Sequence, residues 1–295
     1  MLSKNLKLRY VSSFKCDGHC PFCHREGLTS EEKTRLDRIS RLAELFSERG
    51  FKEVTLAGGE PFPWDNLFKV MDIFNKNRFN LQLTMCGIGL SQDVLSRLPR
   101  FVRSIHLSVP SFDPNRYYHY TGIEFANFKR LLEKSLELGI SIRLNYTITR
   151  EEAAYWRNGL QFAIEKQVDI CLQDMVWCYR LRDVYGQLFV DILDLVENTR
   201  GLYWELQQGY TPRLATFVEG IKVEVKSARL NRIQRYSVCD HCEFDEMCSE
   251  RICSLRIYPG GTLRLCLGGT KDLCWAEGTE NPEGAINRLL SIIER

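Results

Sequence analysis

The chain has 295 residues, of which 44% are apolar and 26% charged, and its net charge is +2 at neutral pH. This length suits one large domain or a domain and a half, and the balanced charge gives no sign of a nucleic-acid or membrane-surface partner. No run of about 18 apolar residues is present, so we expect no transmembrane helix. Residues 1–14 lack the apolar core of a signal peptide, and we therefore expect a cytoplasmic protein.

The first 200 residues alternate between strand-like and helix-like segments. Strands are expected at 6–14, 53–59, 80–86, 104–109, 141–148 and 169–176, and helices at 30–50, 65–77, 91–99, 126–138, 151–167 and 184–199. Ser30 is the expected cap of the first helix, which Gly50 closes. Strands separated by helices pair in parallel through right-handed crossovers. The pattern predicts an α/β fold, either a partial (β/α)6 TIM barrel or a wound sheet.

Beyond residue 200 the pattern changes. Residues 201–214 look irregular, 221–226 form a short strand, and the remainder is rich in cysteine until a final helix at 286–295. We therefore expect a core at 1–220 and a cysteine-rich extension at 221–295.

The twelve cysteines are unusual for such a chain. A reducing cytoplasm does not maintain structural disulfides, so clustered cysteines there more often bind metal or take part in catalysis. Nine of the twelve fall at 16–23 or 239–274, and only Cys86, Cys171 and Cys178 lie between these groups. Two metal centres are the expectation.

The first group is the loop segment Cys16-x3-Cys20-x2-Cys23. Structural zinc takes four ligands, usually as two pairs, and iron–sulfur clusters normally use four cysteines. His19 and His24 lie close by but not at a zinc-like spacing. Three thiolates on one loop can leave one iron open to an outside ligand. This loop follows the first strand and "GGEP" (58–61) follows the second, so both should lie at the carboxyl ends of parallel strands, where active sites form.

The spacing C-x3-C-x-aromatic-C, with Phe22 as the aromatic residue, resembles the radical S-adenosylmethionine (SAM) superfamily when it occurs together with "GGEP". The resemblance implies that Cys16, Cys20 and Cys23 hold a 4Fe–4S cluster whose fourth iron binds the amino and carboxylate groups of SAM. It also implies reductive cleavage of SAM to a 5′-deoxyadenosyl radical, which takes a hydrogen atom from the substrate. The cofactor supplies the chemistry, and the protein orients it and excludes water.

The resemblance also suggests residues that contact SAM. Glu60 would receive the SAM ammonium, Ser108 other polar groups, and Asn145 the ribose or adenine. Cys86 departs from the "TNG"-like turn of many relatives. The full cofactor-binding set is Phe22, Gly58, Gly59, Glu60, Thr84, Ser108 and Asn145.

The second cysteine group, at 239–274, could bind zinc as a zinc knuckle or hold a second iron–sulfur cluster. Behind a radical SAM barrel it resembles the auxiliary-cluster extensions called SPASM and twitch domains, and "GTLRLC" (261–266) matches their hairpin. A single auxiliary 4Fe–4S cluster is expected. The preferred ligands of this cluster are Cys239, Cys242, Cys248 and Cys266. Whether Cys253 or Cys274 also binds it is left open.

Several segments resemble the GTP 3′,8-cyclase of molybdenum-cofactor synthesis. Arg9 and Arg256 match two of that enzyme's arginines and are the expected substrate residues, whereas Ser254, Cys171 and the pair 64–65 replace its other basic side chains. A triphosphate needs several Arg or Lys partners. GTP is therefore not the expected substrate.

The leading hypothesis is a radical SAM enzyme that acts on a small-molecule or nucleoside-like substrate, with a reductant such as flavodoxin or ferredoxin. The alternatives are a peptide-modifying maturase, a divergent GTP 3′,8-cyclase and, in a different class, a zinc-binding module without activity. Asp174 is a candidate base, and Cys178 or Cys171 a candidate hydrogen-atom donor. Buried cysteines are otherwise small hydrophobes.

Overall fold

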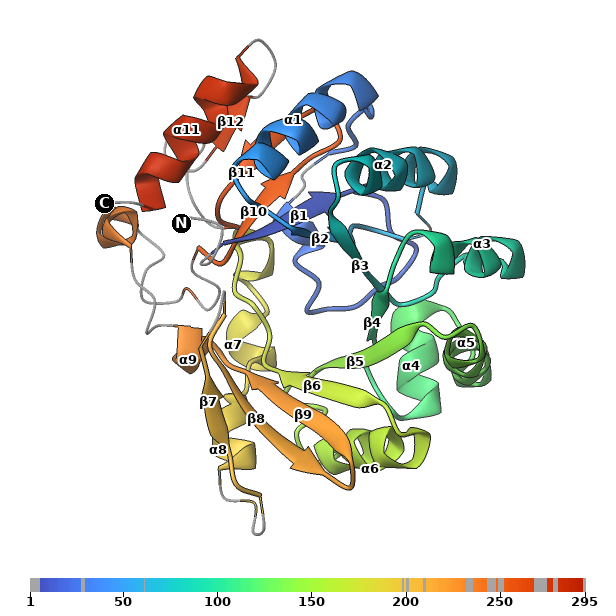
Figure 1. The fold of residues 1–295 in the computed structure, drawn as a ribbon. Helices are drawn as coiled ribbons and strands as arrows, with labels where there is room; N and C mark the ends of the chain where they lie inside the picture. The colour runs from blue at the N-terminus through green and yellow to red at the C-terminus, as the bar shows by residue number, and fades with distance from the viewer. Residues whose placement is uncertain are drawn as a thin grey trace.

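The structure is a computed structural model that describes residues 6–27, 30–60, 62–197, 199, 202–208, 211–231, 236–242, 248, 252–267, 275–277 and 281–293. Within this part of the chain, one twelve-stranded sheet runs in the order β12-β11-β10-β1-β2-β3-β4-β5-β6-β9-β8-β7. The sheet curls on itself as a partial barrel (Figure 1).

The first six strands pair in parallel and in chain order. They are β1 (Lys7–Val11), β2 (Glu53–Ala57), β3 (Asn80–Met85), β4 (Ser104–Ser108), β5 (Ser141–Thr147) and β6 (Asp169–Gln173). The helices that alternate with them lie on the outer face of the sheet (Figure 1): α1 (Leu36–Glu48), α2 (Trp64–Lys76), α3 (Gln92–Arg97), α4 (Pro114–Thr121), α5 (Phe125–Glu137) and α6 (Trp156–Lys166). The predicted partial (β/α)6 barrel is confirmed.

Strand periodicity separates the two faces of the sheet. In β5 the side chains of Ile142, Leu144 and Tyr146 are buried among the helices, while the residues between them line the barrel interior. Helix α5 supplies Phe125, Phe128 and Leu132 to the same core. The interior positions of the strands are mostly polar, and the barrel encloses a cavity there instead of a second core.

The C-terminal part of the chain extends both edges of the sheet. The strands β7 (Glu205–Gln207), β8 (Arg213–Val218) and β9 (Ile221–Lys226) continue it antiparallel to one another, and β9 lies parallel to β6. At the other edge β10 (Ser254–Ile257) runs parallel to β1, followed by β11 (Thr262–Arg264) and β12 (Trp275–Glu277). The sheet is continuous across residues 220–221, and the division into two domains there stays a prediction.

Three local expectations were wrong. Helix α1 begins at Leu36 and Ser30 does not cap it; Glu31 instead accepts hydrogen bonds from the loop after β1, and Glu32 accepts one from Gly260. The helix expected at 184–199 is two short ones, α7 (Tyr185–Leu188) and α8 (Ile192–Val196). The stretch 201–214 contains β7 and the start of β8, which their neighbours in the sheet hold in place.

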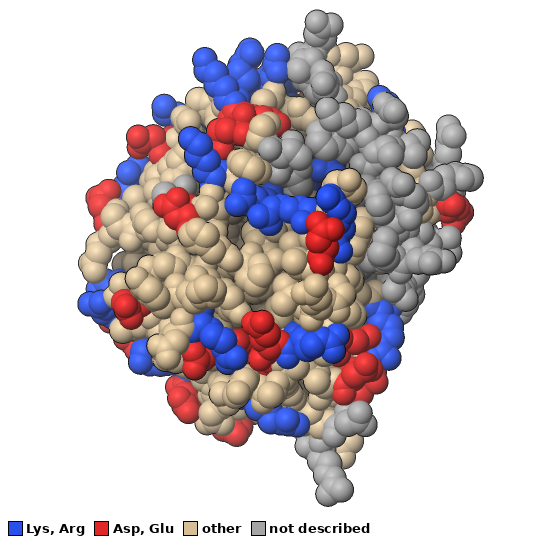
Figure 2. Space-filling view, turned by 180° about the vertical axis from the view of Figure 1, so that it is seen from behind, with Lys and Arg blue, Asp and Glu red and all other residues tan. Residues whose placement is uncertain are grey.

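Two further helices complete the described fold, α9 (Ala228–Asn231) and α11 (Pro282–Ile293), and α11 packs beside α1. The face in Figure 2 carries interspersed Lys, Arg, Asp and Glu side chains, in line with the small net charge. Among the described residues no helix is long and apolar enough to cross a membrane.

Candidate active site

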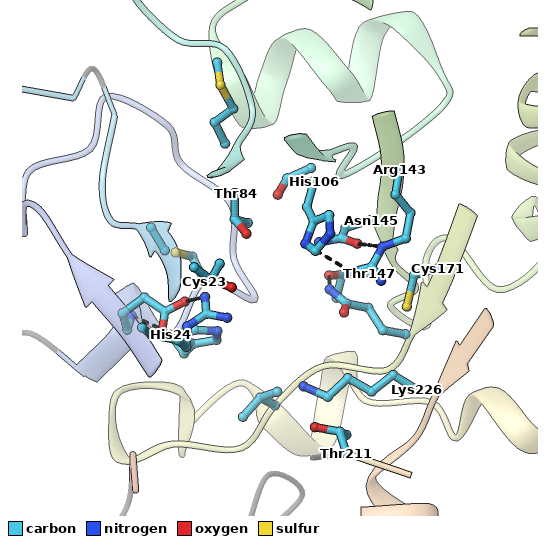
Figure 3. A pocket seen from close by; sticks show the side chains of 18 of the residues that line it. Cys23, His24, Thr84, His106, Arg143, Asn145, Thr147, Cys171, Thr211 and Lys226 are labelled. Atoms are coloured by element: carbon cyan, nitrogen blue, oxygen red, sulfur yellow. Dashed lines mark hydrogen bonds and ion pairs between the residues drawn. The ribbon is translucent and has the colours of Figure 1, made fainter. Parts of the chain in front are cut away.

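A cavity of about 500 Å³ occupies the barrel interior. Figure 3 shows Cys23 and His24 on one wall, with His106, Arg143 and Asn145 facing them across the cavity. A cavity of this size is typical of a small-molecule or cofactor site.

The loop after β1 brings Cys16, Cys20 and Cys23 to this cavity. Its backbone is tied to the loop after β2 and to the last turn of α4: the N–H of Asp17 donates to the carbonyl of Glu60 at 2.7 Å, and that of His19 to the carbonyl of Tyr120 at 2.7 Å. The three thiols therefore lie together at the carboxyl ends of the strands, as expected.

The chemistry of these thiols fits an iron–sulfur cluster. Burial and the neighbouring thiols of Cys23 and Cys16 raise the pKa of Cys20 to about 12, and burial also raises the pKa of Cys23. Bound iron removes this cost because it stabilises the thiolate form. Three soft donors on one wall of a cavity are suitable ligands for such a cluster and leave room for a further ligand beside it.

The glycines of "GGEP" make room for the cysteine loop. A Cβ on Gly59 would lie 1.8 Å from the carbonyl oxygen of Lys15, and a Cβ on Gly58, whose φ is +148°, would lie 2.6 Å from the Ser12 hydroxyl. The Gly59 N–H donates to the Ser13 carbonyl at 2.9 Å. Close approach of two backbones thus accounts for the glycine pair. A contact with SAM, expected from the resemblance, stays a prediction.

Glu60 is buried and its carboxylate organises the loop after β3. It accepts hydrogen bonds from the backbone N–H of Cys86, from that of Gly87 at 2.7 Å and from that of Ile88 at 2.8 Å. Burial raises the pKa of Glu60 to about 7, against the effect of these donors. The Glu60 carboxylate thus already accepts three backbone hydrogen bonds, and a SAM ammonium would be an additional partner. The expected contact with SAM stays a prediction.

The other predicted SAM contacts reach the cavity. Thr84, Ser108 and Asn145 line it from β3, β4 and β5, and Ser108 and Asn145 are direct neighbours across the sheet. Phe22 lies edge-on to Tyr120, with ring centroids 6.3 Å apart, and also lines the cavity. Their roles toward SAM stay predictions.

Arg9 and Arg256 meet on Glu26, a residue that our sequence reasoning missed. Arg9 binds one carboxylate oxygen through Nη2, and the Nε of Arg256 donates to the other at 3.2 Å. Burial opposes ionisation, but Arg9, His24 and Arg256 hold the pKa of Glu26 well below its usual range. Arg9 lines the cavity, whereas Arg256 is 1% exposed and is not part of its lining. The only sequence signal for Glu26 was an acidic residue directly after the cysteine loop.

Of the candidate catalytic residues, Asp174 lies on the cavity wall and its carboxylate accepts the Ala228 N–H at 3.0 Å. Burial raises the pKa of Asp174 to about 7. Cys171 also lines the cavity. Cys178 instead packs in a small apolar cluster with Met175 and Leu181, and the structure does not bring it to the cavity wall.

The second cysteine group is described only in part. Cys239 is buried, while Cys242, Cys248 and Cys266 are partly exposed. Cys253, an open choice on spacing, is buried and lines the cavity. Cys274 lies outside the described residues, and the ligand set stays a prediction.

Comparison with known proteins agrees with this geometry. Residues 10–153 match the radical SAM superfamily. The chain is 23% identical over 268 residues to the GTP 3′,8-cyclase of Clostridium perfringens strain 13, covering 88% of this chain and 80% of that one. It is 28% identical over 148 residues to a probable GTP 3′,8-cyclase of Methanococcus vannielii, covering 47% and 50% of the two chains. It thus spans about half the length of that second relative.

Two solved structures share the fold. Streptococcus suis SuiB bound to S-adenosylmethionine aligns with a TM-score of 0.62 at 16% identity, covering 90% of this chain and 60% of SuiB. The protein anSMEcpe with bound AdoMet aligns with a TM-score of 0.60 at 13% identity, covering 98% and 83% of the two chains. The family implies a 4Fe–4S cluster and SAM. The cysteine loop, the barrel and these matches together indicate a radical SAM enzyme.

Proposed function

We propose that this enzyme removes a hydrogen atom from a small polar metabolite held in the barrel cavity, within a cytoplasmic biosynthetic pathway. The observation that carries the proposal is the cavity itself. Cys16, Cys20 and Cys23 line it, and Cys23 faces a wall of polar side chains that includes His106, Arg143 and Asn145 (Figure 3). A small molecule with several polar groups matches such a wall better than an apolar molecule does.

When bound, the cluster and SAM would supply the radical. A reductant such as flavodoxin or ferredoxin would provide the electron, and methionine and 5′-deoxyadenosine would be the products formed from SAM. Cys16, Cys20 and Cys23 would hold the cluster. Glu60, through the loop after β3, would keep the neighbouring wall in shape.

Asp174 is the proposed proton-transfer group at the cavity wall. Its carboxyl lines the cavity and the N–H of Ala228 anchors it. A pKa raised to about 7 by burial lets it carry or release a proton near neutral pH. Cys171, on β6 just before Asp174, is the proposed hydrogen-atom donor, because Cys178 is not on the wall.

We also propose an auxiliary 4Fe–4S cluster held by cysteines of the C-terminal extension. Support comes from the proximity of Cys239 and Cys253 to Tyr236. Burial is the main cause that raises the pKa of the Tyr236 hydroxyl, and the charges of these two cysteines act in the same direction. Because Cys253 lines the cavity, a cluster that includes it would lie beside the substrate. The candidate ligands are Cys239, Cys242, Cys248, Cys253 and Cys266.

A peptide is the second candidate substrate. A crystal structure of SuiB bound to its precursor peptide SuiA shares this fold, with a TM-score of 0.59 at 16% identity. In the present chain, Gln207 of the edge strand β7 lines the cavity, while Leu206 beside it is exposed. An edge strand can pair with an extended peptide. GTP is less well supported, since Arg256 is buried on Glu26.

Extracts from cells grown in deuterated medium distinguish these substrates. The reconstituted, dithionite-reduced enzyme is incubated with SAM and either the small-molecule or the peptide fraction. We expect the small-molecule fraction to stimulate formation of 5′-deoxyadenosine that carries deuterium. Deuterium transferred only from the peptide fraction would establish the second candidate. Transfer from neither fraction would contradict hydrogen abstraction from a substrate in this cavity.

A further inference from the structure

Cationic side chains collect at the end of the cavity that lies away from the cysteine loop. Lys7 reaches it from β1, Arg143 from β5 and Arg213 from β8, and His106 of β4 lies beside them. None of these residues forms a local motif, because they are far apart in sequence. The barrel alone brings them together.

The positions along the strands give the depth of this group. Lys7 lies four residues before Val11, the end of β1, and the cysteine loop begins beyond that end. At about 3.3 Å per strand residue, Lys7 is roughly 13 Å below the carboxyl end of the strand. Arg143 likewise lies four residues before Thr147, the end of β5. The cations thus form the floor of the cavity.

The floor carries more positive than negative charge. Its carboxylate is Glu224, which binds Arg143 Nη1 at 2.8 Å, Arg213 Nη1 at 2.7 Å and Lys222 Nζ at 2.9 Å. One carboxylate therefore faces three cations. Lys7 adds a fourth, and its Nζ donates to the neutral amide oxygen of Gln82 at 2.5 Å.

The lowered pKa values of Lys7 and His106 agree with this excess of positive charge. Burial, followed by the nearby charge of Arg9, lowers the pKa of Lys7 to about 7; Arg143 and Arg213 act in the same direction and Glu53 opposes them. Burial and then Arg143 lower the pKa of His106 to about 2, so His106 is neutral. Buried positive charge of this kind is costly without a counter-ion.

We propose that Lys7, Arg143 and Arg213 bind an anionic group of the substrate, a phosphate or a carboxylate, at the floor of the cavity. The inference rests on the proposed function, since it assigns one end of the same substrate. The anion anchors the molecule at the floor, and the carbon that loses hydrogen lies toward the cysteine loop. Guanidinium groups suit both kinds of anion because they donate two parallel hydrogen bonds.

Anion binding to the reconstituted enzyme tests the subsite without any need for turnover. Calorimetric titrations use pyrophosphate and tricarballylate as separate probes. We expect Lys7→Met and Arg213→Gln each to weaken the better probe about 10- to 100-fold, the loss typical of one charge-assisted hydrogen bond. Tighter binding of pyrophosphate would indicate a phosphate group, and tighter binding of tricarballylate a carboxylate.

Two control variants make the result specific. Lys222→Met removes a cation from the same Glu224, but Lys222 is not part of the cavity lining; it should change the affinity less than about threefold. Lys7→Arg keeps the positive charge and should retain most of the anion binding. That result would show that the loss in Lys7→Met comes from the missing charge and not from a defect in folding. The subsite is refuted if neither probe binds, or if Lys7→Met and Arg213→Gln bind as the parent does.

SAM cleavage is measured on the same samples. Anion binding that depends on Lys7 together with no 5′-deoxyadenosine would support the subsite and refute the proposed function. 5′-Deoxyadenosine formation without anion binding would refute the subsite alone.

Discussion

The two ends of the cavity are built in different ways. At the cysteine end, backbone hydrogen bonds and glycines join two loops and the end of helix α4, as in the contacts of Asp17 with Glu60 and of His19 with Tyr120. At the floor, the charged side chains of Lys7, Arg143 and Arg213, from three strands, converge on Glu224 and Gln82. The first end depends on the shape of the backbone and the second on the balance of charge, so different substitutions should damage them.

The largest expected effect is that of Gly59→Ala at the cysteine end. The new Cβ would lie 1.8 Å from the Lys15 carbonyl oxygen, a contact that only movement of the loop can relieve. We expect a loss of at least about 3 kcal/mol in the free energy of unfolding and loss of iron from the first cluster, while binding of anions at the floor persists.

Denaturant unfolding and iron analysis measure both effects, with Gly186→Ala as the control. A Cβ at Gly186 meets nothing within 4 Å. Full iron content and parental stability in Gly59→Ala would show that the close approach of the loops is not required.

A similar loss is expected for Glu26→Gln, at the wall between the two ends. This change leaves Arg9 and the fully buried Arg256 without their carboxylate. Removing one partner of a buried ion pair costs about 3–5 kcal/mol. Asp37→Asn breaks the exposed pair with Arg35 and should cost less than about 1 kcal/mol. Equal unfolding free energies for the two variants would contradict a buried charge network.

A smaller effect is expected from pH at the floor. Sulfate keeps its charge across neutral pH, so its affinity reports the protonation of the protein. The pKa of Lys7 is lowered to about 7 and a bound anion raises it again, so affinity should fall above pH 7, by at most about tenfold per pH unit. The same titration with Lys7→Met should change less with pH than that of the parent, because the cavity groups that still have a pKa of about 7, Glu60 and Asp174, lie beyond the carboxyl ends of β2 and β6, away from the floor. A parent affinity that does not change with pH would contradict a role for the Lys7 charge.

The two ends of the cavity also differ in how far the sequence predicts them. Cys16, Cys20, Cys23 and "GGEP" are short local patterns, and apolar alternation placed all six parallel strands, so the cysteine end was predicted. The convergence of Lys7, Arg143 and Arg213 depends on closure of the barrel and on β8, whose start lay in a stretch expected to be irregular. Ser30 failed as a cap because the acidic residues after it anchor other loops.

The most direct test of the central claim is the yield of 5′-deoxyadenosine from SAM. The anaerobically reconstituted, dithionite-reduced parent is compared with the Cys16→Ala, Cys20→Ala, Cys23→Ala triple variant, and iron content is measured in both. We expect the parent to form 5′-deoxyadenosine, and the triple variant to form none while it keeps the iron of the proposed auxiliary cluster. A parent that binds no iron or cleaves no SAM, or a triple variant that still cleaves it, would contradict radical SAM activity at the cysteine loop.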